Sequence, residues 1–138
     1  MEKKNQSNIG KKDTIKVLVP DRQISPVVFA SPHSGIEYPA EFVTNSPLDL
    51  FALRKSEDAF VDVIFSEAPN YGMPLISALF PRAFVDPNRE PFELDPGMFE
   101  ETLPDYVNTQ SSRVHAGLGT IARVVSSGQE IYSKKLKF

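Results

Sequence analysis

Short apolar runs, separated by prolines and other turn-forming residues, predict the strands of a sheet. Alternating apolar positions over residues 15–19 predict a short strand that ends at a proline. Residues 26–30 form a continuous apolar run, which is typical of a strand covered on both faces. Two further strands are expected at residues 73–80 and 82–85, with Pro81 at a bend or strand end.

Helical spacing is clearest between residues 46 and 69. Ser46-Pro47 resembles a helix start with proline in the first turn, and the apolar residues that follow it reach Leu53. A second helix is predicted from Ser56, whose hydroxyl would cap it, to Pro69. Because strand, helix and strand follow one another, we expect an α/β sheet with its functional loops at strand ends.

Turn-forming residues dominate the chain after the predicted strand at 82–85. Residues 86–97 are rich in proline and lack periodicity, and long stretches of this kind are usually functional or disordered. Residues 121–125 are predicted to form another strand, and residues 131–136 a short helix or a strand end.

Length and composition are those of one soluble globular domain, with 138 residues, of which 41% are hydrophobic and 24% charged. Residues 1–13 are polar and are predicted to be a disordered leader before a single folded domain at 14–138. They contain no apolar run of the kind found in a secretory signal peptide. The longest apolar stretch of the chain, residues 72–80, has about half the length of a membrane-spanning helix. A net charge of −3 with scattered basic residues argues against nucleic acid as a binding partner. The absence of cysteine fits a protein of a reducing compartment. The sequence therefore predicts a cytoplasmic protein that binds neither nucleic acid nor membrane.

Histidine is scarce, since the chain has only His33 and His115. His33 follows the apolar run at 26–30 and lies in the breaker-rich segment Ser31-Pro32-His33-Ser34-Gly35. A neutral imidazole at the end of a strand can bind zinc, with neighbouring serines as supporting partners. The alternative is a hydrogen-bonded histidine in a tight turn, and His115 is expected to be a surface residue of a glycine-rich loop.

Two groups of charged residues are further candidates. Glu57 and Asp58 are adjacent carboxylates at a predicted helix start, where they could bind a metal or only complement the helix dipole. No HExxH-type spacing joins them to His33. Arg89, in the segment Asp86-Pro87-Asn88-Arg89, has the planar fork that suits a substrate carboxylate, although an ion pair with a nearby acid is an equal alternative. Arg82 is a weaker candidate of the same kind.

Four blocks of sequence, in this order, resemble the N-formylglutamate amidohydrolase family. They are residues 31–35, residues 53–61, residues 80–89, and residues 116–119 followed by 123–125. The resemblance covers roughly residues 26–136. Two departures are Ala122, where proline is expected, and His115, where another residue is expected; neither concerns the proposed chemistry.

The resemblance implies a three-layer α/β sandwich around a mixed sheet, of the zinc-carboxypeptidase-like (phosphorylase/hydrolase-like) type and incomplete at the C-terminus. It implies hydrolysis of N-formyl-L-glutamate to formate and glutamate, in one route of histidine degradation. His33 matches the family's zinc-binding histidine, and Asp58 or its neighbour Glu57 the second ligand. Arg89, with Asn88 and Asp86, matches the motif expected to hold a substrate carboxylate.

The resemblance also implies that family members continue well beyond residue 138, into a segment that carries a further histidine. That segment would complete the zinc site and supply the general base, so no catalytic residue is assigned in this chain. A catalytic zinc normally has three protein ligands and one open position. The open alternatives are therefore an enzyme that works with a separately encoded second half, a catalytically silent remnant, and a non-catalytic module that binds a small dicarboxylate.

Overall fold

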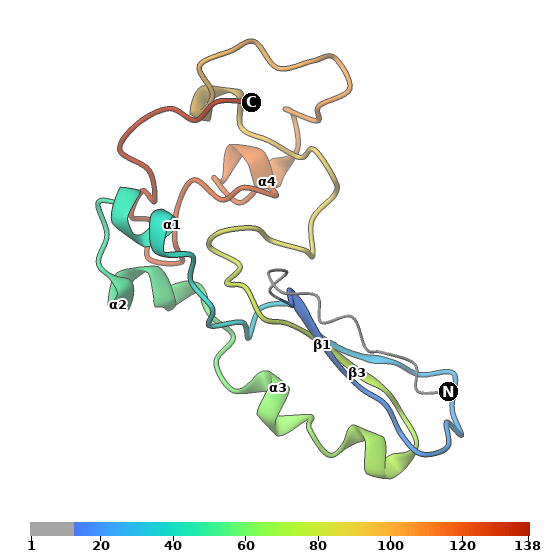
Figure 1. The fold of residues 1–138 in the computed structure, drawn as a ribbon. Coiled ribbons are helices and arrows are strands. Elements are labelled where there is room, and N and C mark those ends of the chain that lie inside the picture. The colour runs from blue at the N-terminus through green and yellow to red at the C-terminus, as the bar shows by residue number, and fades with distance from the viewer. Residues whose placement is uncertain (1–12) are drawn as a thin grey trace, which may run out of the picture.

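A computed structural model describes residues 13–138 and contains a mixed three-stranded sheet with helices, an α/β arrangement (Figure 1). Its strands are β1 (Ile15–Leu18), β2 (Phe29–Ser31) and β3 (Leu75–Ala78), in the order β1-β3-β2. β1 pairs antiparallel and β2 parallel with the central β3. The predicted leader, residues 1–13, lies outside the described residues except for Asp13.

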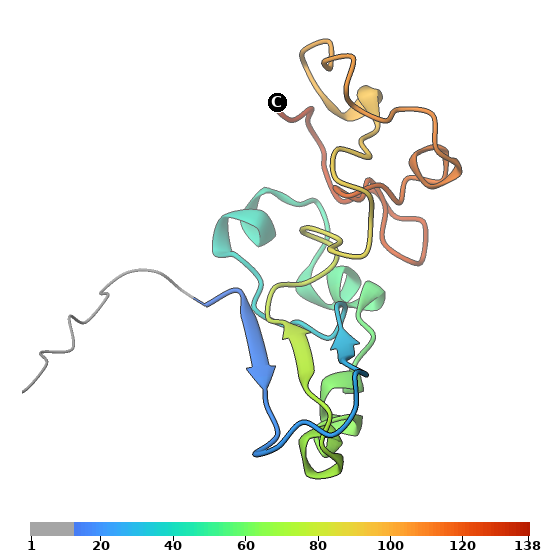
Figure 2. The same ribbon diagram turned by 90° about the vertical axis from the view of Figure 1, so that its right-hand side faces the viewer.

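The strand register divides the sheet into two unlike faces. Leu75 and Ser77 of β3 are buried on one face, where the ring of Phe29 stacks on Phe65 with their centroids 5.2 Å apart. Ile76 lies on the opposite face, beside Val17 of β1. The helical segment after residue 60 therefore covers one face, and Figure 2 looks onto the other.

The helical elements are short. They are α1 (Ala40–Asn45), α2 (Leu50–Leu53), η1 (Arg54–Ser56), α3 (Val61–Ile64), η2 (Ala68–Tyr71), η3 (Pro96–Met98) and α4 (Ser112–His115), where η denotes a 3-10 helix. None among residues 13–138 is long and apolar enough to cross a membrane.

The helix predicted over residues 56–69 is wrong in its start and its length. Phe60 has a φ of 67°, a left-handed conformation that interrupts helical hydrogen bonding, and α3 begins only after it. The hydroxyl of Ser56 accepts a hydrogen bond from the backbone N–H of Ser126 instead of capping a helix. The earlier helix starts at Leu50 and is capped by Asp49, whose side chain accepts from the N–H of Ala52 at 2.7 Å.

Four further predicted regions are also corrected. Residues 82–85 form turns in which the N–H groups of Phe84 and Val85 donate to Pro81 O. Residues 121–125 and 131–136 form only isolated bridges, because their backbone groups are satisfied by loops. The run at 26–30 becomes a strand only at Phe29 and is not covered on both faces, since Ala30 is exposed.

Residues 86–138 form an irregular region at the carboxyl ends of β2 and β3 (Figure 2). Two apolar clusters organise the part of the protein beyond the sheet. The first contains Phe42, Leu53, Ala83, Ala122, Val125 and Ile131, and the second contains Leu94, Met98, Phe99 and Val107. The first cluster joins α1 and α2 to the C-terminal loops. It thereby brings segments distant in sequence to the end of β2, where His33 lies.

Candidate functional site

The loop after β2 is packed tightly beneath the candidate site. Ser31, His33 and Ser34 are all buried, and the hydroxyls of Ser31 and Ser34 are 2.6 Å apart. Gly35 lies so close to the chain after β3 that a Cβ atom there would be 2.1 Å from Phe80 O. The loop therefore holds His33 by backbone packing as well as by hydrogen bonds.

Replacement of Gly35 by alanine is expected to lower the free energy of unfolding by about 1–3 kcal/mol, because backbone atoms must move to admit the methyl group. Urea unfolding measures the change. Gly97→Ala is the matched control, since its Cβ would approach only the flexible Asp95 side chain, at 3.1 Å. Equal effects of the two substitutions would contradict this explanation.

The imidazole of His33 lies between two carboxylates. Its Nδ1 is 3.1 Å from Asp58 Oδ2, and its Nε2 is 2.8 Å from Asp86 Oδ1. The backbone adds a third link, because the N–H of Asp58 donates to His33 O at 3.0 Å. Three segments separated by 25 and 53 residues are thus joined around one ring.

Asp86 is the buried anchor of this group, with an exposed fraction of 3%. It accepts hydrogen bonds from His33, from the N–H of Asn88 at 2.9 Å and from Nη2 of Arg82 at 2.9 Å. Burial alone would raise its pKa, but the hydrogen bonds from His33 and Asn88, with the charges of His33 and Arg82, lower the pKa to about 2. Asp86 is therefore an ionised acceptor at neutral pH.

The two arginines of this region have different settings. Nε of Arg89 donates to Leu118 O, Nη1 donates to Asn88 O, and Nη2 is 3.4 Å from Asp86 Oδ2. The Arg89 side chain is 10% exposed, whereas that of Arg82 is 22% exposed and lies 3.9 Å from Asp58. Of the two arginines singled out in the sequence, Arg89 thus pairs with Asp86, and Arg82 bridges Asp86 and Asp58.

Glu57 is turned away from the imidazole of His33. One carboxylate oxygen accepts from the hydroxyl of Tyr38 at 2.8 Å, the other from Nε of Arg54 at 3.2 Å, and the side chain is 4% exposed. Burial and the hydrogen bond to Glu57 together raise the pKa of Tyr38. The structure therefore brings His33, Asp58, Asp86 and Arg82 together, while Glu57 belongs to a neighbouring polar contact.

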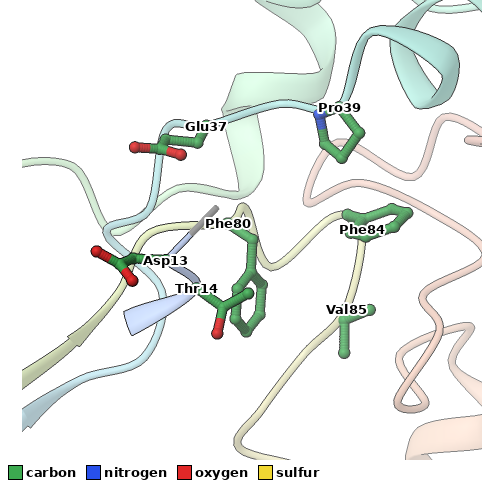
Figure 3. Close-up of a pocket in the computed structure, with 7 residues that line it drawn as sticks. All are labelled: Asp13, Thr14, Glu37, Pro39, Phe80, Phe84 and Val85. Atoms are coloured by element: carbon green, nitrogen blue, oxygen red, sulfur yellow. The ribbon is translucent and has the colours of Figure 1, made fainter. Parts of the chain in front are cut away.

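A cleft of about 350 Å³ opens beside these side chains. Asp58, Arg82 and Asp86 form its polar wall, and Leu118, Ala122 and Val124 form its apolar wall. A larger groove, of about 470 Å³, is separate and mainly apolar, with Phe80 and Phe84 on its walls and the carboxylates of Asp13 and Glu37 beside them (Figure 3). The cleft and not the groove therefore adjoins His33's partners.

Ser126 is a site residue that the sequence did not indicate. Its N–H donates to Ser56 Oγ at 3.0 Å, and its hydroxyl donates to Lys55 O at 2.6 Å. These bonds fix the segment that leads into Asp58. The sequence around Ser126 does not indicate this role, because its partners Ser56 and Lys55 lie some 70 residues away in the chain.

Comparison with known proteins decides the family. The sequence model of N-formylglutamate amidohydrolase matches residues 25–138. The chain belongs to this family. A solved structure of similar fold is the N-formylglutamate amidohydrolase from Ralstonia eutropha JMP134, with a TM-score of 0.80 and 33% identity. The match covers 90% of this chain and 43% of that one, and none of the curated proteins matches.

Membership of the amidohydrolase family raises the question of whether these residues suit a zinc ion. If Nε2 of His33 carries the proton toward Asp86, its Nδ1 lone pair faces an Asp58 oxygen at 3.1 Å. Two acceptors at that separation need a proton or a cation between them. Two ligands of one tetrahedral zinc lie about 3.3 Å apart, so the pair fits two zinc ligands. Within residues 13–138, no group of three or more potential ligands is arranged around one point, and His115 is exposed on α4.

Proposed function

We propose that this chain provides part of a zinc-dependent amidohydrolase that cleaves the N-formyl amide of N-formyl-L-glutamate into formate and glutamate, a step of histidine degradation. The observation that carries the proposal is the placement of His33 Nδ1 against Asp58, with Asp86 behind the ring. Family membership supports amide hydrolysis in general. The likeness to zinc carboxypeptidases and the cytoplasmic location stay predictions.

His33 and Asp58 would hold the zinc ion, and Asp86 would orient His33. Asp86 would accept a hydrogen bond from Nε2–H of His33 and so leave the Nδ1 lone pair directed toward Asp58. Glu57 is the weaker choice of ligand because Tyr38 and Arg54 occupy its oxygens. When bound, zinc polarises the substrate carbonyl and lowers the pKa of a coordinated water to about 7.

Arg82 is the cation that we assign to the glutamyl carboxylate. It lines the cleft, whereas all three nitrogens of Arg89 have partners within the protein. Arg89 and the N–H of Asn88 would then support Asp86. The apolar wall opposite would contact the methylene groups of the substrate, and a cleft of about 350 Å³ is within the usual range for small-molecule sites.

Formate release from N-formyl-L-glutamate tests the reaction directly. We expect release that requires added zinc and is lost with a chelator when this chain is combined with the part of the Ralstonia relative outside the 43% match. Absence of formate from that folded, zinc-saturated mixture would overturn the reaction. The dicarboxylate-binding alternative is favoured by the position of Arg82 in the cleft, and it predicts calorimetric binding of glutamate that a chelator leaves unchanged.

Asp58→Asn and Glu57→Gln distinguish the two adjacent acids. Asp58→Asn should weaken zinc binding by more than about tenfold, because a neutral amide is a poor zinc ligand. Glu57→Gln should leave zinc affinity unchanged, since Glu57 points to Tyr38. Competition with a chromophoric chelator measures both. The reverse order of effects would reassign the ligand to Glu57.

A further inference from the structure

Lys55 is a cation of the cleft that takes no part in the ion pairs of residues 13–138. It lies in η1, which follows α2 (Figure 1), and it lines the cleft together with Arg82. Arg82 is already paired with Asp86, at 2.9 Å. The ammonium nitrogen of Lys55 instead lies 5.8 Å from the centroid of the Phe51 ring, a cation–π contact that is weak at an exposed site. The Lys55 ammonium group is therefore available to an anionic ligand.

The acids that line the same cleft have partners of their own. Asp58 and Asp86 both contact the imidazole of His33. The carboxylate of Glu57 is turned into the protein, and its side chain is only 4% exposed. The positive charge of Lys55 is therefore not the counter-ion of these acids, and a carboxylate ligand would not have to displace one of them.

The next residue, Ser56, brings a hydroxyl group to the same cleft. Its Oγ accepts a hydrogen bond from the N–H of Ser126 at 3.0 Å, so its own proton stays available to a ligand. The hydroxyl of Ser126 donates to the carbonyl oxygen of Lys55 at 2.6 Å, and Ser126 thereby holds the backbone of both residues at the cleft. An ammonium group and a hydroxyl proton from adjacent residues can together bind one carboxylate.

We propose that Lys55 and Ser56 form a second carboxylate subsite of the cleft. A glutamyl group carries two carboxylates, at its α and γ positions, and Arg82 is assigned to only one of them. The flexible four-carbon stem of Lys55 lets its ammonium group reach the other. The cleft would then hold a dicarboxylate by both ends and discriminate against substrates that lack the second charge. This inference rests on the proposed function, which supplies the glutamyl ligand.

N-acetyl-L-glutamate and N-acetyl-L-glutamine separate the subsite from the rest of the cleft, because they have nearly the same shape and differ by one carboxylate charge. Each is titrated into the whole chain, saturated with zinc and at low salt, and NMR chemical shifts give the two dissociation constants. Lys55→Met removes the ammonium group and keeps an apolar stem, whereas Lys55→Arg retains the charge. Lys16→Met is the matched control, since Lys16 is exposed on β1 and does not line the cleft.

We expect the unmodified protein to bind the glutamate compound about fivefold more tightly than the glutamine compound, the effect of one solvent-accessible ion pair. Lys55→Met should abolish most of this preference, Lys55→Arg should keep it, and Lys16→Met should leave it unchanged. An unchanged preference in Lys55→Met, or an unmodified protein that binds neither compound or binds both equally, would overturn the subsite. The titration involves no turnover, so a Lys55-dependent preference without formate release would count against the proposed reaction alone.

Discussion

Asp86→Asn is expected to lower the free energy of unfolding by about 3–5 kcal/mol, the range for breaking a buried ion pair by removing one partner. Asp86 is 3% exposed and accepts from His33, Arg82 and the N–H of Asn88, with Arg89 close by. The neutral amide of asparagine would leave the guanidinium groups of Arg82 and Arg89 without the Asp86 carboxylate as their counter-ion. Urea unfolding of the zinc-free protein at neutral pH measures the loss.

Asp105→Asn is the matched control, because Asp105 is exposed and surface substitutions of this kind usually change stability by less than about 0.5 kcal/mol. If Asp86→Asn were as mild as the control, Asp86 would not be the anchor of the site.

Acid titration gives an independent signature of Asp86. Its pKa is about 2 in the folded protein and 3.8 ordinarily, so its stabilising contribution is fully present above about pH 4. It is lost as the pH falls from about 4 through 2, and it amounts to about 2 kcal/mol. Asp86→Asn should therefore flatten the pH dependence of unfolding in this window, whereas Asp105→Asn should leave it intact.

Removal of the imidazole should have the largest effect on metal binding. His33→Ala is expected to weaken zinc binding by more than the 10–100-fold typical of a supporting partner, because His33 would be a direct ligand. His115→Ala is a matched control, since His115 is the other histidine and is exposed. Calorimetric zinc titration measures both. Similar zinc affinities for the two variants would show that His33 is not a ligand.

Candidate site residues could be predicted where their immediate sequence neighbours indicate a functional loop or a helix start. His33 follows an apolar run in a breaker-rich loop, and the structure places it buried at the end of β2. The acids at 57 and 58 and the arginine at 82 were also singled out from sequence. Their division of roles was not predictable, because adjacent side chains point in different directions: Glu57 toward Tyr38 and Asp58 toward His33.

Long-range packing explains most of what the sequence left open. Apolar runs at 82–85 and 121–125 satisfy strand periodicity, yet Ala83, Ala122 and Val125 fill one cluster with α1 and α2 residues. Their backbone groups bond to turns and loops in place of a strand ladder. The pairing of Asp86 with His33 spans 53 residues, and no local pattern specifies it.

Anomalous diffraction from zinc-soaked crystals tests the central claim most directly, since it locates the ion without reference to turnover. We predict a zinc peak between His33 and Asp58, about 2.0–2.2 Å from Nδ1 of the first and from an oxygen of the second. A crystal saturated with zinc that shows no ion at this pair, or shows it only at Glu57 or His115, would contradict the account.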